Sequence, residues 1–346
     1  MDLNKSIRLA LAIVKGVLGL VVFVFAVMFA MRFYPQWFES AKVAAPLATP
    51  WKVNSVSAGL PAGEKGQLIR YGHQLVTESP RWMGPMAEKP DMRFAGNNLA
   101  CKNCHMQAGT QAGASSFVGV TARFPQFRGR ENKMGTIEDR VNGCMERSMN
   151  GRMLPVDSRE MQAIVAYMTW VGEGLPAGRE AEFKGFPTIK IPEFAADTIR
   201  GRAIYVAQCQ VCHGADGQGV RLAGADSVYG YTYPPLWGPD SYNHGAGMHR
   251  VLTAAEFIKG NMPFGTTWEN PKLSDEEAYH VAAFINQFDR PQKANPEDDF
   301  PDRKLKPVST PYGPWDDDFP ALQHKYGPFL PIIDYYQKTF GIKKSK

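Results

Sequence analysis

The sequence predicts an all-α protein with an N-terminal transmembrane helix, two helical domains built to the same plan, and an irregular C-terminal extension. Three observations lead to this fold class. An apolar run occupies residues 9–31, two segments repeat the order helix, Cys-x-x-Cys-His motif, loop and helix, and no sustained periodicity follows Arg290. The chain has 346 residues, which is room for two domains of ordinary size.

The N-terminal apolar run is long enough to cross a bilayer as a helix. Its single charge, Lys15, lies close enough to the N-terminal end to reach the lipid headgroups. We therefore expect a transmembrane anchor over residues 9–32, in contact with the lipid bilayer through residues 9–31. A secretory signal peptide cleaved near Ala44-Ala45 is the alternative.

Basic residues are placed unevenly around this run. Lys5, Arg8 and Lys15 lie toward its N-terminal side, and Arg32 follows it. The positive-inside rule therefore places residues 1–8 in the cytoplasm. Over the whole chain, 39 Lys and Arg against 34 Asp and Glu give a net charge of +5, which suits anionic ligands or acidic lipid headgroups. This excess is mild, and we expect no nucleic-acid partner.

The two domains are delimited by helix signals. The helices that open and close them are expected over residues 64–78, 158–171, 196–208 and 274–288. Ser158 and Ser274 begin the closing helices with the pattern of N-caps. The chain then divides into a linker at 33–60, a first domain at 61–175, a linker at 176–195, a second domain at 196–289 and a C-terminal extension at 290–346. The aromatic residues of the extension are expected to pack over a domain.

Each domain carries a Cys-x-x-Cys-His motif after its opening helix. The motifs consist of Cys101, Cys104 and His105, and of Cys209, Cys212 and His213. The two thiols of such a motif add to the vinyl groups of a haem, and the adjacent histidine becomes the proximal iron ligand. Zinc or dithiol chemistry is the alternative, but no four-ligand zinc spacing can be assembled without these same residues. The sequence thus predicts two cytochrome c-like domains, each with one covalently bound haem c.

Covalent haem attachment takes place outside the bacterial cytoplasm, so the two domains must be exported. Together with the orientation of the N-terminal helix, this gives an expected location. We predict a single-pass protein of the bacterial inner membrane whose haem domains lie on the periplasmic side.

The residue opposite the proximal histidine determines what a haem can do. In the second domain, Met262-Pro263 lies in the loop ahead of the closing helix, the usual place for a thioether ligand. His213 and Met262 would make an electron-transfer haem of fairly high potential. His244 and His249 are the competing candidates for this position.

In the first domain two residues compete for the sixth iron position. Met153 is the candidate by analogy with the second domain. Cys144 is the one cysteine outside the two motifs, and an unpaired thiol in an oxidising compartment needs a reason. A helix over 136–149 would place Arg140, Cys144 and Ser148 on one face, one turn apart. These neighbours would favour a thiolate able to bind iron or attack sulfur, although a buried bystander cysteine fits the same spacing.

The segment around this helix resembles the signature of the di-haem thiosulfate dehydrogenases. The likeness lies in Gly129-Arg130-Glu131, in the run from Ile137 to Gly151, in Leu154-Pro155 and in the helix at 160–170. It is specific in the first domain, whereas the second domain resembles cytochromes c in general. The membrane segment is a departure, because members of that family are often soluble periplasmic proteins.

The resemblance implies that the first haem is the active site. Its iron would be bound by His105 and the thiolate of Cys144. Two thiosulfate ions would be oxidised to tetrathionate there, in a reaction that can also run in reverse. The substrate pocket would be lined by Arg130, Arg140 and Ser148.

The resemblance also implies that the second haem, bound by His213 and Met262, exports the electrons to a cytochrome or another redox protein. Family members can carry a lysine beside this methionine as an alternative ligand. Here the neighbour is Asn261, and Lys259 lies three residues before Met262. The sequence therefore leaves a ligand switch open.

A different class of function also fits the residues. The chain could be a membrane-tethered di-haem electron carrier between a quinol-oxidising enzyme and a terminal oxidase or reductase, with Met153 on the first iron. Such a carrier has no substrate chemistry of its own. It would need no arginine-lined face, and it would leave Cys144 without a role.

Overall fold

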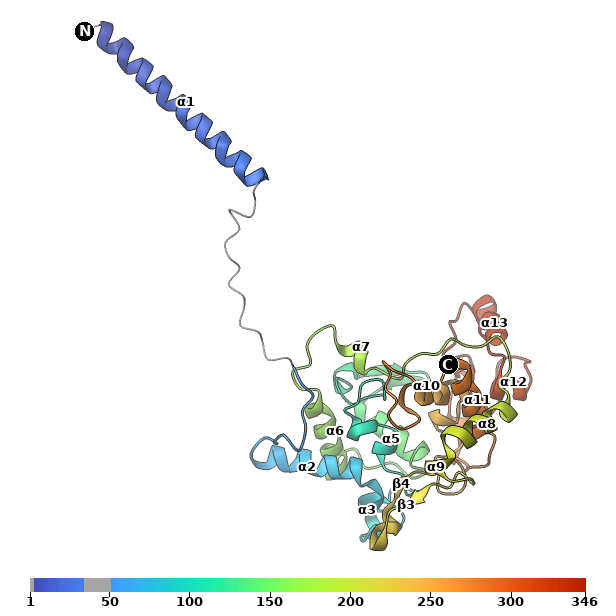
Figure 1. Cartoon of the computed structure of the whole chain (residues 1–346). Coiled ribbons are helices and arrows are strands. Elements are labelled where there is room, and N and C mark those ends of the chain that lie inside the picture. The colour runs from blue at the N-terminus through green and yellow to red at the C-terminus, as the bar shows by residue number, and fades with distance from the viewer. Residues whose placement is uncertain (1–2, 34–50) are drawn as a thin grey trace. The chain divides into compact units, whose positions relative to one another are not determined.

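The computed structural model describes residues 3–33 and 51–346, which fall into two compact units, one within Met1–Pro50 and one from Trp51 to Lys346 (Figure 1). In the first unit the described residues form helix α1, Leu3–Phe33. Its segment Leu11–Phe33 has a mean hydropathy of 2.6, and none of it is buried. The apolar N-terminal helix is confirmed. The alternative cleavage site at Ala44-Ala45 and most of the linker at 33–60 lie outside the described residues.

The regular secondary structure in the first half of the second unit is helical apart from one short hairpin, with loops between the elements. Its helices are α2 Gly63–Thr77, α3 Ser79–Met83, α4 Met106–Gly109, α5 Ile137–Arg147 and α6 Arg159–Val171. The antiparallel strands β1 Gln126–Arg128 and β2 Lys133–Gly135 precede α5 and pair Phe127 with Met134. The predicted opening, middle and closing helices of this domain are therefore present.

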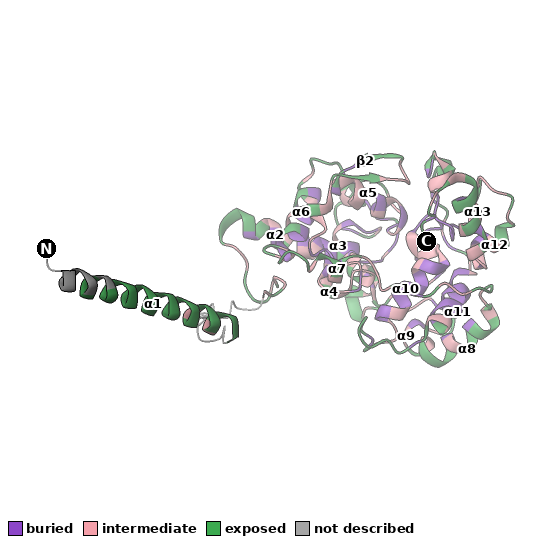
Figure 2. Ribbon diagram, turned by 90° about the horizontal axis from the view of Figure 1, so that it is seen from above, coloured by how far each residue is buried: buried purple, intermediate pink, exposed green. Residues whose placement is uncertain are grey.

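The second half repeats this order, and it includes an 11-residue helix that the sequence analysis did not predict. Its elements are α7 Glu180–Phe183, α8 Thr198–Gln208, α9 Gln210–His213, β3 Val220–Arg221, β4 Tyr231–Tyr233, α10 Val251–Asn261 and α11 Asp275–Asn286. This 11-residue helix is α10. Buried residues concentrate in α10 and α11, which form the centre of this half (Figure 2).

In both halves the opening helix crosses the closing helix at a glycine. A Cβ at Gly72 of α2 would lie 1.9 Å from the carbonyl oxygen of Ala163 on α6. A Cβ at Gly201 of α8 would lie 2.1 Å from the carbonyl oxygen of His280 on α11. Both distances are far below van der Waals contact, so any side chain at either glycine would force the two helices apart.

Three helices of the second unit begin after a residue whose hydroxyl caps the helix. The hydroxyl of Thr136 accepts from the backbone N–H of Asp139, whose carboxylate accepts from the N–H of Thr136 in return. Ser158 caps α6 and Ser274 caps α11 in a similar way. Such caps contribute about 1 kcal/mol each to helix stability.

The C-terminal extension is mostly irregular, with two short helices, α12 Ala321–Tyr326 and α13 Leu330–Phe340. Its side chains complete the second hydrophobic core through four buried residues: Val308, Phe329, Ile332 and Tyr336. The hydroxyl of Tyr279 on α11 also donates a 2.6 Å hydrogen bond to the carbonyl of Tyr326. The extension therefore packs over the second domain, as its aromatic content predicted.

Candidate active site

His105 and His213 are oriented in the same way by the loops that follow them. Nδ1 of His105 donates to the carbonyl oxygen of Ser115 (2.7 Å), and Nδ1 of His213 donates to that of Pro234 (2.8 Å). Because a carbonyl oxygen only accepts, Nδ1 carries the proton in both rings and Nε2 keeps its lone pair. This is the arrangement in which a histidine ligates a metal.

An apolar cavity adjoins the first motif. Cys101, Cys104 and His105 contribute to its lining, together with mainly apolar side chains that include Val76, Leu99, Phe117, Val120, Ile164 and Met168. Burial raises the pKa of Cys101 to about 11 and that of Cys104 to about 12, so both thiols are neutral at pH 7. None of the five cysteines, all within the described residues, forms a disulfide. These residues fit a flat apolar group that is fastened through both thiols, as haem c is.

Cys144 differs from the motif cysteines in its electrostatic surroundings. It lies on α5, and its Sγ accepts a 2.7 Å hydrogen bond from Nη1 of Arg140, one turn earlier on the same helix. Burial alone would raise the pKa of this thiol. The charge of Arg140, the nearby His105 and the hydrogen bond from Arg140 together outweigh burial and lower the pKa to about 6. The Cys144 side chain therefore favours the thiolate at neutral pH, as its helix neighbours predicted.

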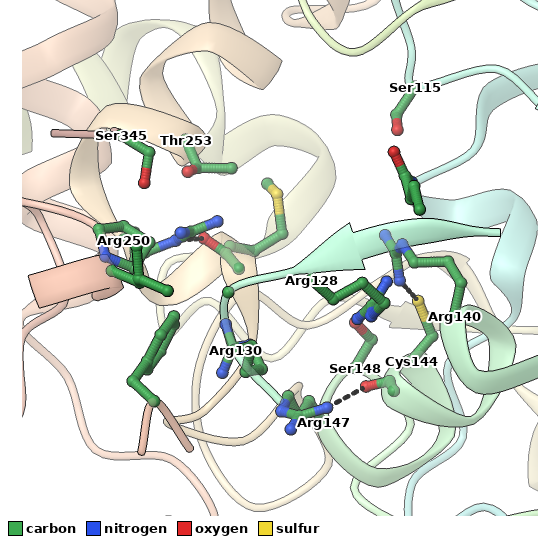
Figure 3. A pocket seen from close by; sticks show the side chains of 18 of the residues that line it. Ser115, Arg128, Arg130, Arg140, Cys144, Arg147, Ser148, Arg250, Thr253 and Ser345 are labelled. Atoms are coloured by element: carbon green, nitrogen blue, oxygen red, sulfur yellow. Dashed lines mark hydrogen bonds between the residues drawn. The ribbon is translucent and has the colours of Figure 1, made fainter. Parts of the chain in front are cut away.

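A second, more polar cavity opens beside the apolar one and shares His105, Arg140 and Cys144 with it. Its volume of about 640 Å³ lies within the range of about 300–1,000 Å³ that is usual for small-molecule sites. Five arginines contribute to its lining: Arg128, Arg130, Arg140, Arg147 and Arg250 (Figure 3). A cavity with this lining suits a small anion.

Three of these arginines are paired with carboxylates. Asp299 of the C-terminal extension lies 2.6 Å from Arg130 and 2.5 Å from Arg147, and Arg128 pairs with Glu131 at 2.9 Å. Asp299 is 2% exposed. Its burial would raise its pKa, but the hydrogen bond from Arg147 and the charges of Arg130 and Arg147 lower the pKa overall. In the described part of the chain, the other two arginines have no Asp or Glu side chain within 4.0 Å, and Nη1 of Arg250 lies 3.2 Å from an oxygen of Lys346, the last residue.

The cavity brings together the residues that the resemblance placed at the active site. Arg130, Arg140, Cys144 and Ser148 all line it with His105. Met153, the competing ligand of the first iron, lines neither cavity, and its side chain is 57% exposed.

Sequence reasoning missed four residues of this site: Arg128, Arg147, Arg250 and Asp299. Two of them, Arg128 and Arg147, lie within or next to the signature segment and could have been examined with it. Arg250 and Asp299 lie far along the chain, and no local pattern around them indicates a role in the first domain.

Met262, the candidate ligand of the second iron, ends α10 and is half-buried against the second core. Asn261 before it is buried. Its amide nitrogen donates to the carbonyls of Phe257 and Gly113, and its side-chain oxygen accepts from Gln111. Asn261 thereby ties the end of α10 to the loop that follows the first motif.

The other candidates for the second iron already have partners. Lys259 forms an ion pair of 2.9 Å with Asp275. Nδ1 of His249 donates to the carbonyl of His244, and Nδ1 of His244 accepts from the backbone N–H of Lys293. Each of these side chains therefore already has an ion-pair or hydrogen-bond partner within the protein.

Each of the two domains matches a family of known proteins. Residues 92–177 match the family model of the SoxA/TsdA cytochrome c domain, and residues 196–285 match that of cbb3-type cytochrome c oxidase subunit III. A thiosulfate dehydrogenase of Allochromatium vinosum is 42% identical over 247 residues, which are 70% of this chain and 86% of the relative. The chain belongs to the thiosulfate dehydrogenase family.

Two further members of the thiosulfate dehydrogenase family support this assignment. The thiosulfate dehydrogenase of Stutzerimonas stutzeri is 39% identical over 67% of this chain and 71% of its own length. The solved thiosulfate dehydrogenase TsdBA of Marichromatium purpuratum matches with a TM-score of 0.62 and 34% identity, over 73% of this chain and 53% of that chain. The predicted fold of two cytochrome c domains, with one haem c each, is confirmed.

Proposed function

We infer that the chain is a cytochrome-linked thiosulfate oxidoreductase, and we propose that it joins two thiosulfate ions into tetrathionate beside His105 and Cys144. The overall change forms one sulfur–sulfur bond and releases two electrons, with no proton gained or lost. The observation that carries this proposal is the position of Cys144, which shares a cavity with His105 while Arg140 holds its sulfur at 2.7 Å.

The arginines would offset the electrostatic repulsion between the two thiosulfate dianions, which is the main energetic cost of bringing them together. At about 4 Å and an effective dielectric constant of about 20, each pair of unit charges repels by roughly 4 kcal/mol. Arg140 carries its charge beside the reacting thiolate, and Arg130 lines the same cavity. Guanidinium groups offer forked donors that match sulfonate oxygens as they match carboxylate or phosphate.

Cys144 would act as the sulfur nucleophile. Its thiolate bonds to the outer sulfur of the first thiosulfate as two electrons leave, which gives a cysteinyl S-thiosulfonate. The outer sulfur of the second thiosulfate then attacks that sulfur, releases tetrathionate and restores the thiolate. Read backwards, the same steps reduce tetrathionate, so the site supports both directions.

The haem held by His105 and Cys144 would accept the electrons, and the haem held by His213 and Met262 would pass them to a cytochrome or another redox protein. The half-buried position of Met262 supports its part in this assignment. We further propose that α1 is retained as a membrane anchor. Its apolar length and exposed side chains support that role.

The electron-carrier alternative receives less support from the site. It requires Met153 as the sixth ligand of the first iron, yet this side chain is 57% exposed and outside both cavities. It also gives no role to a thiolate paired with Arg140.

Purified full-length protein tests the proposed function directly. With thiosulfate and ferricyanide as the electron acceptor, one tetrathionate should form for each two ferricyanide ions reduced. The Arg70→Gln protein is a matched control, because Arg70 is exposed and lines neither cavity. Reduction of the haems by other donors without any tetrathionate from thiosulfate would favour the carrier.

A further inference from the structure

Arg290 is a buried cation that the proposed chemistry leaves without a role. It lies just after the end of α11, and it is 7% exposed. One nitrogen of its guanidinium, Nη2, donates to the carbonyl of Ile285 (3.2 Å) and to Oδ1 of Asn286 (3.1 Å). The other two nitrogens, Nε and Nη1, are buried and have no hydrogen-bond partner in the described part of the chain. Most of the donors of this guanidinium therefore lack an acceptor.

No carboxylate side chain of the described residues pairs with Arg290. None lies within 4.0 Å of the guanidinium, and the adjacent Asp289 is exposed. Burial, followed by the charge of Arg290, lowers the pKa of His249 to about 3 and lowers the pKa of Lys325 as well. A buried guanidinium with unpaired donors and no counter-charge is costly. Its surroundings fit an anion that the polypeptide does not provide.

Arg290 adjoins the surroundings of both haems. Its guanidinium carbon lies 4.3 Å from the ring centre of Tyr242, and this ring lines the apolar cavity beside the first motif. The residue before it is joined to the second haem site, because the carbonyl of Asp289 accepts from the backbone N–H of Gly238, in the loop that orients His213. Arg290 itself lines neither the apolar nor the polar cavity. It is therefore not placed to meet the substrate.

A haem propionate is the anion that fits this position. Haem c carries two propionate carboxylates on the edge opposite its thioether bonds. Because the haems are bonded to the cysteines of the two motifs, folding brings these carboxylates into the protein, whereas a free anion would have to reach a side chain that is 7% exposed. Guanidinium groups form strong, charge-assisted hydrogen bonds with carboxylates.

We propose that Arg290 donates to a haem propionate through its unpaired nitrogens. Either haem can supply the carboxylate, since Arg290 adjoins the surroundings of both. The contact would neutralise the buried cation and fix the propionate edge of that haem between the two domains. It requires the two haems but no thiosulfate chemistry, so it holds or fails independently of tetrathionate formation.

Resonance Raman spectroscopy of the purified full-length protein tests the contact, because the propionate-bending band of a haem responds to hydrogen bonding at its carboxylate. Arg290→Gln should shift this band for one haem. Arg290→Lys should shift it too, because the charge stays while the planar donor set is lost. Arg70→Gln should leave it unchanged, since Arg70 is exposed and lines neither cavity. Propionate bands equal to those of the wild type in both Arg290 variants would overturn the proposal.

Redox titration supplies a second readout and identifies the haem. A cation beside a propionate favours the reduced haem, which carries one negative charge more than the oxidised haem. Arg290→Gln should therefore lower the potential of one haem, and Arg290→Lys should retain most of the wild-type value. The Cys144 and Met262 ligands of the proposed function give the two irons different electron paramagnetic resonance signals, which show whose potential has fallen. Unchanged potentials of both haems in Arg290→Gln would also overturn the contact.

Discussion

The carboxylate of Asp299 accepts a 2.6 Å hydrogen bond from Nη1 of Arg130, across 169 residues of sequence. The same carboxylate accepts a 2.5 Å hydrogen bond from Nη2 of Arg147. In addition, the backbone N–H of Phe300 donates to the carbonyl of Arg130. The C-terminal extension therefore does more than cover the second domain. It fixes two arginines of the first domain at the wall of the anion cavity.

Removing this carboxylate charge should destabilise the protein. In Asp299→Asn, Arg130 would lose its carboxylate partner and Arg147 would keep only the more distant Glu131 and Glu146, and breaking a buried pair costs about 3–5 kcal/mol. Denaturant unfolding should show the loss. Asp318→Asn is the matched control, because Asp318 is an exposed carboxylate of the same extension, and it should change stability by less than about 0.5 kcal/mol. Equal stability of both variants would show that Asp299 is not an anchor.

The same carboxylate should make stability depend on acidity. The pKa of Asp299 is lower in the folded protein than in the unfolded chain, so its contribution is present above the unfolded value of about 3.9 and is lost as pH falls through the folded value. The stability gap between wild type and Asp299→Asn should therefore be constant near neutral pH and shrink below about pH 4. A gap that widens in acid would contradict the assigned pairing.

Arg140→Lys should lower activity moderately, because the charge beside Cys144 is kept while the forked donor set is lost. We expect a loss of about 1–3 kcal/mol in substrate or transition-state binding. Arg140→Gln should be worse, since it also removes the charge that favours the thiolate. Steady-state thiosulfate kinetics of the two variants would measure the difference, and equal rates would argue against an electrostatic role.

Replacing Met1–Phe38 by a cleavable export signal should give a soluble protein that keeps both haems and its activity. The described part of this segment is an apolar helix that belongs to a different compact unit from the one that holds the candidate site. Haem content and ferricyanide-linked turnover of the soluble form check the expectation. Loss of either would show that α1 does more than tether the chain.

Most of the fold followed from local signals in the sequence. Thr136, Ser158 and Ser274 mark the starts of three helices, because their hydroxyls accept from backbone N–H groups three residues on. Helix α10 was missed because it lacks such a signal. It begins after Arg250, which provides no side-chain cap.

The candidate site could be predicted only where its parts are close in sequence. Arg140 and Cys144 are one turn apart on α5, so their contact follows from helix geometry. Arg250 and Asp299 reach the cavity through packing of the second domain and the extension onto the first. Contacts of that range depend on the whole fold, and no periodicity or cap encodes them locally.

The central claim is that Cys144 binds the first iron and takes part in the sulfur chemistry. Cys144→Met tests it most directly, with Met153→Leu as the matched control at the competing position. A thioether can ligate iron but carries no charge to stabilise Fe(III), and it cannot attack sulfur. The decisive measurement is the electron paramagnetic resonance spectrum of the oxidised proteins, taken together with their thiosulfate turnover. We predict a changed first-haem signal, a raised potential and turnover lower by orders of magnitude in Cys144→Met, with Met153→Leu unchanged. An unchanged spectrum and full turnover in Cys144→Met would contradict the account and favour the electron carrier.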